Sequence, residues 1–165
     1  CSWVSTESML PDAQAALEKM AGFLVHAQAG VSLIWGVGQI ESEMTISPAQ
    51  MLIDNEMIAY VRRVQSGFGV TDETLQLGLV REVGIGGSFL ETEHTLLNYR
   101  SHLFHPGLLC RSKRELWAAE GGRDLARAAQ DRADELLAAP AAPTVDAQQQ
   151  RSLREIEASF MARVR

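Results

Sequence analysis

The stretch from Ser32 to Gln50, SLIWGVGQIESEMTISPAQ, decides the fold because it joins an apolar run to two closely spaced glycines and a helix start. The apolar run, Val31 to Trp35, is too short for a helix and lies between glycines. It is therefore typical of a strand buried on both faces of a parallel sheet. A strand, a loop and a helix in this order predict an α/β fold. One strand needs neighbours, however, and the rest of the chain barely supplies them.

Helices account for most of the remaining sequence. Ser47 can cap a helix, Pro48 suits its first position, and Gln50 can close a capping box. Apolar spacing and end signals predict helices at residues 11–28, 48–66, 71–83, 92–104 and 112–138, the last with a break at Gly121-Gly122. Caps are predicted at Asp12, Thr71, Thr92, a capping box at 112–115, and Asp146 before a final helix. Residues 139–145, APAAPTV, are predicted to be a linker.

Composition excludes several classes of function. The 165 residues are 46% hydrophobic, which is enough for a core, and their net charge of −6 argues against binding to nucleic acid. Two cysteines make no disulfide framework, and there is neither a signal peptide nor an eighteen-residue apolar stretch. We expect a soluble, cytoplasmic protein that binds no membrane. The chain begins with Cys1 rather than Met, so we also expect it to be a piece of a longer protein.

The loop after the predicted strand is a candidate binding site. Gly36 and Gly38 match the first two glycines of a dinucleotide fingerprint, but Glu41 stands where the third is needed. The glycines are better explained by the close approach of a ligand or of neighbouring backbone to the strand end. Gln39 and Glu41 then become candidate polar groups of the site. The alternative is a solvent-exposed acidic turn.

Three further residues are candidates for function. Trp35 ends the predicted strand, and an indole face attracts quaternary ammonium groups, although core packing explains the residue equally simply. His94 lies one turn inside a helix that follows a glycine-rich loop, where a structural capping role is the alternative. Asp54 falls beside an apolar helix face, which predicts a hydrogen bond to a backbone amide or to an arginine.

Other catalytic chemistry has little support in the sequence. His102, His105 and Cys110 are spaced in a way that suggests zinc, but a Pro-Gly pair interrupts the geometry and no second ligand pair exists. We therefore predict no metal site. No Ser-His-Asp or Cys-His arrangement is present, and the G-x-S-x-G motif of hydrolases is absent.

Several ordered blocks give the chain a specific resemblance to a known family. They are PDAQAALEK (11–19), GVSLIWGVGQIES (30–42), TISPAQMLIDNEMIAYVRR (45–63), EVGIGGSFLETEHTLLNYR (82–100) and a W-x3-G pattern at Trp117 and Gly121. With these blocks the chain resembles the C-terminal third of the trimethylamine methyltransferase family, which includes glycine betaine methyltransferases. The resemblance runs from about Pro11 to Leu137.

The resemblance implies the end of a (β/α)8 barrel in residues 1–108 and a helical C-terminal extension in 109–165. It implies an enzyme that moves a methyl group from trimethylamine, glycine betaine or a related amine to the Co(I) of a corrinoid, which a separate cognate corrinoid protein carries. No cofactor would be bound directly, and a homo-oligomer is expected. The substrate-binding residues would be Trp35, Gly38, Gln39, Glu41, Phe89 and His94.

Two departures from the family pattern concern the substrate. Trp35 stands where we would expect His, and Ser88 stands where His is frequent. Both lie in predicted site loops, so the amine itself stays open. Some relatives carry pyrrolysine, and this sequence shows none. A complete barrel needs about 200 residues or more, so the alternative function is a catalytically silent helical module that binds a partner or dimerises.

Overall fold

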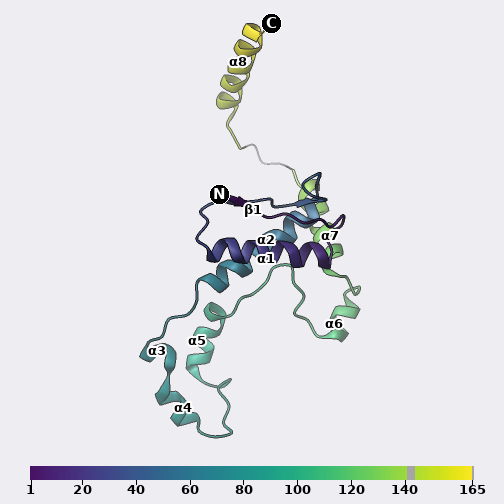
Figure 1. The fold of residues 1–165 in the computed structure, drawn as a ribbon. Coiled ribbons are helices and arrows are strands. Elements are labelled where there is room, and N and C mark those ends of the chain that lie inside the picture. Colours follow the sequence, from purple (N-terminus) through teal and green to yellow (C-terminus); the bar gives the residue numbers. More distant parts are fainter. Residues whose placement is uncertain (141–143, 165) are drawn as a thin grey trace. The chain divides into compact units, whose positions relative to one another are not determined.

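The computed structural model describes residues 1–140 and 144–164, and in them helices predominate over short strands (Figure 1). The strands are β1 (Ser2–Trp3), β2 (Ile34–Trp35), β3 (Gln39–Ile40) and β4 (Thr45–Ile46). The helices are α1 (Ala13–Gln28), α2 (Pro48–Gln65), α3 (Asp72–Leu75), α4 (Leu77–Val83), α5 (Glu93–His102), α6 (Arg114–Ala119), α7 (Leu125–Ala138) and α8 (Ala147–Val164). The mostly helical character predicted from the sequence is thus confirmed.

Contacts divide the chain into two units, Cys1–Asp134 and Glu135–Arg165. In the first unit α1 and α2 pack side by side, with β1 and β2 beside them (Figure 1). Their core is built on Val4, Phe23 and Val61, all nearly inaccessible to solvent. Burial of such side chains stabilises the fold by about 1.5–3 kcal/mol each. The predicted division at residues 108 and 109 stays a prediction.

The two short strands β1 and β2 form a parallel pair in which Ser2 lies opposite Ile34 and Trp3 opposite Trp35. Backbone N–H groups of Ser2 and Val4 donate to carbonyls of β2 and of the residue before it, each at 2.9 Å. The parallel direction agrees with the predicted α/β character. The expectation of a longer strand buried on both faces was wrong: β2 has two residues, and Trp35 is 46% exposed. Helices cover one face of the pair, and within the described residues the indole of Trp35 keeps contact with solvent on the other.

The predicted cap residues mark the starts of α1 and α2 correctly. Asp12 caps α1 by accepting from the Ala15 N–H at 3.0 Å, and Ser47 caps α2 by accepting from the Gln50 N–H at 3.1 Å. The capping box predicted at Gln50 was wrong, because the Gln50 side chain is fully buried and donates to Asp54 instead. The Ser47 N–H donates to the Gly38 carbonyl at 2.9 Å.

Two other helix predictions needed correction. Residues 71–83 form two helices, since Gln76 adopts a left-handed backbone with φ 45° between α3 and α4. The capping box predicted from Ser112 is absent, because α6 begins one residue later with Lys113 as its cap and no side-chain cap bond. Thr71 and Thr92 do cap α3 and α5. The break at Gly121-Gly122 separates α6 from α7, and both glycines have positive φ.

The second unit contains α8, which Asp146 caps as predicted: its Oδ1 accepts from the N–H groups of Gln148 and Gln149 at 2.8 Å. The centre of the predicted linker, residues 141–143, lies outside the described residues. Within its own unit, α8 exposes the apolar residues Leu153, Ile156, Phe160, Met161 and Val164. No helix among residues 1–140 and 144–164 is long and apolar enough to cross a membrane.

Candidate functional site

A buried ion pair lies beneath the loop that follows β2. Lys19 of α1 and Asp54 of α2 are both fully buried, and the Lys19 Nζ lies 2.6 Å from the Asp54 Oδ2. The Gln50 amide donates to the other carboxylate oxygen at 2.8 Å. The hydrogen bond predicted for Asp54 is confirmed, since it accepts from the Gly38 N–H at 2.7 Å. Its cationic partner is Lys19, a residue that the sequence did not single out.

The same ion pair holds the backbone of the loop. The Lys19 Nζ donates to the Gly36 carbonyl at 3.0 Å and to the Gln39 carbonyl at 2.8 Å. Together with the bond from Gly38 to Asp54, these contacts bind backbone groups of three of the four loop residues. The backbone of Gly38 and Gln39, two predicted substrate-binding residues, is therefore committed to the protein interior.

Gly36 and Gly38 are required by the backbone. Gly36 has φ 109°, and a Cβ there would lie 2.1 Å from the Val4 carbonyl oxygen. Gly38 has φ 80°, and its Cβ would lie 3.1 Å from the Met51 side chain. Of the alternatives offered by the sequence, close approach of neighbouring backbone is the one observed at Gly36. Only glycine allows the strand end to lie this close to the segment after β1.

The loop continues through an unusual backbone. Glu41, Ser42 and Glu43 have φ values of 54°, 49° and 67°, so three consecutive non-glycine residues adopt the left-handed region. Each such residue costs about 1–3 kcal/mol, which surrounding contacts must offset. Here the N–H groups of Glu41 and Ser42 donate to the carbonyls of Ser8 and Thr6 at 2.8 and 3.0 Å. The loop is therefore anchored on the segment after β1 as well as on the ion pair.

The polar side chains of the loop differ in whether their oxygen atoms already have a hydrogen-bond partner. The Glu41 carboxylate is half-buried and accepts from the Thr45 hydroxyl at 2.6 Å. The Gln39 side chain is also half-buried, and in the described part of the chain its Oε1 has no hydrogen-bond partner. The Gln39 Oε1 is itself buried, so it is an unpaired acceptor inside the protein, whereas Glu41 is partly used in holding the turn. The sequence also allowed a solvent-exposed acidic turn. In the structure, backbone hydrogen bonds from Glu41 and Ser42 anchor this turn on the segment after β1.

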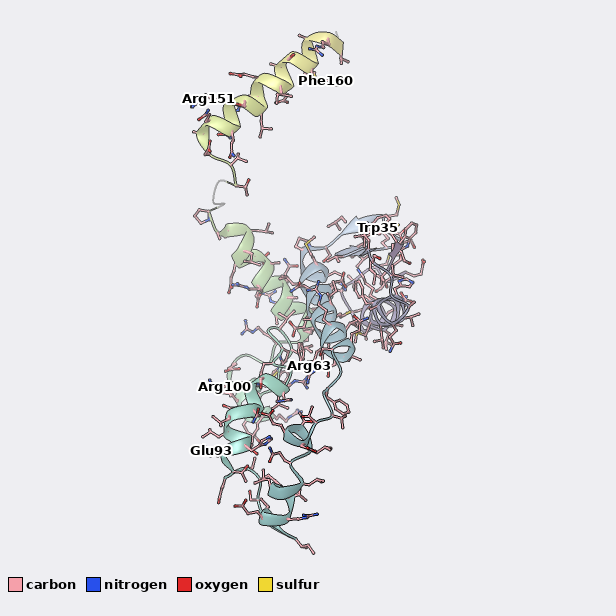
Figure 2. All side chains as sticks on the ribbon, turned by 90° about the vertical axis from the view of Figure 1, so that its left-hand side faces the viewer. Trp35, Arg63, Glu93, Arg100, Arg151 and Phe160 are labelled. Atoms are coloured by element: carbon pink, nitrogen blue, oxygen red, sulfur yellow. The ribbon has the colours of Figure 1, made fainter. Side chains whose placement is uncertain are left out.

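An aromatic pair lies on the strand face opposite the helices. Val4 and Ile34 pack into the core, and since strand side chains alternate, Trp3 and Trp35 point the other way. Their ring centroids are 5.2 Å apart at an interplanar angle of 76°, an edge-to-face contact. Trp3 is 50% exposed and Trp35 is 46% exposed. Figure 2 shows Trp35 beside the strands at the edge of the first unit. Within the described residues Trp35 is therefore not packed in the core, and its role in ligand binding stays a prediction.

Carboxylates line the neighbouring segment after β1. Glu18 of α1 accepts from the Thr6 hydroxyl at 2.5 Å and from the Glu7 N–H at 2.9 Å. Hydrogen bonds, that from Thr6 foremost, hold the pKa of Glu18 below its ordinary value. The Ser42 hydroxyl donates to the Glu7 carboxylate at 2.5 Å. The segment after β1 and the loop that contacts it therefore carry several carboxylates, which favours a cationic ligand there.

The structure places His94 and Phe89 elsewhere. His94 lines a groove of ≈ 920 Å³ between α5 and the segment around α3, together with Phe68, Leu90 and Tyr99. Phe89 is 43% exposed in the loop before α5. Figure 2 shows Trp35 well separated from Glu93, the residue next to His94. Of the predicted site residues, the structure thus brings together Trp35, Gly38, Gln39 and Glu41 and leaves the other two apart.

The three residues whose spacing suggested zinc are all exposed, namely His102, His105 and Cys110. Arg63 of α2 donates to the His102 carbonyl at 2.8 Å, so this segment is tied to α2 by its backbone. Among the described residues no three His, Cys, Asp or Glu side chains form a group that could hold a metal ion.

Sequence reasoning missed Lys19 and Trp3. Lys19 precedes Met20, which lies on the predicted apolar face of the helix, but nothing in the sequence around Lys19 shows that its side chain is buried. Its partner, the buried Asp54, lies on another helix. Trp3 lies in a strand of two residues, which is too short to show alternation. The sequence did contain one signal for Trp3, because Trp3 and Trp35 are the last residues of the two strands that α1 connects.

Comparisons with known proteins show which family the chain belongs to. The family model of trimethylamine methyltransferase (MTTB) matches residues 1–164. Trimethylamine methyltransferase MttB of Desulfitobacterium hafniense is 40% identical over 140 residues, which are 82% of this chain and 28% of that protein. MttB2 of Methanosarcina mazei is 38% identical, over 86% of this chain and 28% of the relative. A glycine betaine methyltransferase of Desulfitobacterium hafniense is 27% identical, over 69% of this chain and 24% of the relative. The chain thus spans about 28% of the length of the first two relatives.

Proposed function

Because this chain belongs to the trimethylamine methyltransferase family, we propose that its complete gene product moves a methyl group from a methylated amine to the Co(I) of a corrinoid. A separate cognate protein carries the corrinoid, and the amine is trimethylamine, glycine betaine or a related compound. The names of the relatives support a methylated amine as substrate. The shared family supports the barrel, of which β1 and β2 would be two strands.

The observation that carries this proposal is the exposed edge-to-face pair of Trp3 and Trp35 at the end of two parallel strands. A methylated ammonium group spreads its charge over its methyl surface, and indole faces attract such cations by about 0.5–2 kcal/mol. The negative surroundings supplied by Glu7, Glu18 and Glu41 add attraction at longer range. The pair therefore fits the head group of the proposed substrate.

The chemistry asks the protein mainly to position its substrate. The corrinoid supplies a strong cobalt nucleophile, so no nucleophilic side chain is needed from this chain. The tasks left to its residues are to orient one methyl group and to keep water from the ammonium. Trp3 and Trp35 bind the head group in this proposal, and the buried Oε1 of Gln39 accepts from a bound water.

The parallel pair also supports membership of a larger sheet. Two strands alone are not stable in water, and parallel sheets are normally covered on both faces. In the proposed barrel, α1 and α2 lie outside, and Trp3 and Trp35 face the interior at its substrate end.

The test is methyl transfer by the complete gene product. It is mixed with its corrinoid protein in the Co(I) state, and either trimethylamine or glycine betaine is added. We expect the absorption spectrum of methylcobalt to grow with at least one methylated amine and to depend on both proteins. The proposal is wrong if no tertiary or quaternary methylated amine gives methylcobalt.

A second candidate function is a helical module that associates with itself. The five exposed apolar side chains of α8 favour it, since they form one stripe of a helix that buries no residue in its own unit. Light scattering of the chain and of a variant with Leu153→Ser and Phe160→Ser separates the two cases. A methyl-transfer-inactive protein whose oligomer is lost in this variant would support the module.

A further inference from the structure

We propose that the buried ion pair of Lys19 and Asp54 positions the substrate loop: it fixes the backbone of residues 36–39, and thereby the ligand groups of Trp35 and Gln39, without touching the ligand. The role of Trp35 and Gln39 as ligand groups rests on the proposed function. The control of loop geometry by the ion pair rests on the contacts alone. Lys19 and Asp54 are thus positioning residues.

The contacts of the ion pair are directed at the loop. The Lys19 ammonium has three protons, and it donates to the Gly36 carbonyl, the Gln39 carbonyl and the Asp54 carboxylate. Asp54 in turn accepts from the Gly38 N–H between those two carbonyls. The Lys19 cation of α1 thus binds two carbonyls of the loop backbone, and the Asp54 anion of α2 binds one N–H group.

Other contacts also hold residues 36–39 in this path. The Gln39 N–H donates to the Gly36 carbonyl at 3.2 Å, and Gln39 belongs to β3, where it pairs with Ile46 of β4. The positive φ of Gly36 and Gly38 is permitted by glycine but not enforced by it. The Gly38 carbonyl accepts from the Ser47 N–H at the start of α2, which anchors the loop at one further point. To these contacts the ion pair adds three charge-assisted hydrogen bonds, which tie the loop backbone to α1 and α2.

Stability alone does not account for a charged pair at this place. Burying each ion costs several kcal/mol, and apolar side chains of similar size often serve a core equally well. Apolar side chains cannot offer hydrogen bonds to backbone groups of opposite polarity at neighbouring residues. The specific contribution of Lys19 and Asp54 is therefore the geometry of the loop.

The experiment uses the double variant Lys19→Met with Asp54→Leu in the full chain, which removes both charges and keeps the core apolar. The matched control is Ile53→Ala, which weakens the packing of α2 in a separate buried cluster that contains no residue of the loop. Far-UV circular dichroism confirms that both variants are folded. Two readouts need no ligand: the NMR signal of the Trp35 indole N–H, and the hydrogen-exchange rate of the Gln39 amide, whose N–H bonds neither Lys19 nor Asp54.

We expect the Gln39 amide of the double variant to exchange about tenfold faster or more, because each lost bond to a charged group is worth about 1.5–3 kcal/mol. The Trp35 indole signal should shift or broaden. Ile53→Ala should change neither readout beyond its effect on global stability. An unchanged Gln39 exchange rate and an unchanged Trp35 signal in the folded double variant would overturn the proposal.

A third readout links the loop to the ligand. Tetramethylammonium is titrated into the complete gene product and into both of its variants, and we expect the double variant to bind it about tenfold more weakly. Equal affinity in a folded double variant would overturn the positioning role. If the wild-type complete gene product binds no methylated ammonium compound, the ligand part of the proposed function fails. The exchange and indole readouts then still decide whether the ion pair controls the loop.

Discussion

Trp3 and Trp35 contact each other edge to face with their ring centroids 5.2 Å apart, although one stands near the N-terminus and the other after the first long helix. The parallel register of β1 and β2 sets this contact, because it places the two residues directly opposite each other. The two half-exposed rings thus form one aromatic surface. This surface lies next to the loop that Lys19 and Asp54 hold.

The aromatic surface predicts the effect of Trp35→Ala on ligand binding. Loss of one indole should weaken the binding of tetramethylammonium or glycine betaine by about threefold to thirtyfold, the range of cation–π energies. Isothermal titration of the complete gene product measures this affinity. The control is Trp117→Ala, since the Trp117 indole N–H donates to the Arg123 carbonyl at 2.8 Å in the segment between α6 and α7. Equal affinities of wild type and Trp35→Ala would reject Trp35 as a ligand group.

Removal of one charge of the buried pair should destabilise the fold more than removal of both. Lys19→Met leaves the Asp54 carboxylate buried without its cation, and we expect the free energy of unfolding to fall by about 3–5 kcal/mol. The double variant with Asp54→Leu removes the unpaired carboxylate and should recover part of this loss, while the three loop backbone groups that the pair bound stay without those partners. Urea unfolding followed by circular dichroism measures both values. A single variant as stable as the double one would show that the charges do not depend on each other.

Gly36→Ala should be strongly destabilising because both sterics and backbone conformation oppose a side chain there. The new Cβ would lie 2.1 Å from the Val4 carbonyl oxygen, and φ is 109°. We expect a loss of more than about 2 kcal/mol in the free energy of unfolding. Gly69→Ala is the matched control, since its Cβ meets nothing within 4 Å and its φ is not positive. Equal melting temperatures for the two variants would contradict the close approach of the strand end to Val4.

Glu18 gives the chain a pH dependence. The pKa of its carboxyl is lowered in the folded state, chiefly by the hydrogen bond from the Thr6 hydroxyl. A lowered folded pKa stabilises the protein above the ordinary value of 4.5, and this stabilisation is lost as the pH falls from 4.5 through the folded pKa. Melting temperatures measured from pH 6 to pH 3 should therefore fall less steeply in Glu18→Gln than in wild type. Thr6→Val should show part of the same flattening, and parallel curves for all three proteins would contradict the assignment.

The candidate site was only partly predictable from the sequence. The loop itself was found, because glycines after an apolar run and polar residues beyond them are local signals. Lys19 was missed, because a lysine is normally solvated and nothing near it in the sequence shows that a carboxylate on another helix will neutralise it. His94 was a candidate from its position after a glycine-rich loop and from the resemblance, and the structure places it in a groove that Trp35 does not line.

The sequence by itself determined the positions of α1, α2, α5 and α8, since caps and apolar spacing act within a few residues of each other. It also determined the family, because ordered blocks survive in a chain that covers only part of its relatives. Only the tertiary structure decided that Trp3 meets Trp35 and that Lys19 meets Asp54. Both contacts join residues far apart in the chain, so the packing of α1 against α2 and the register of two very short strands create them.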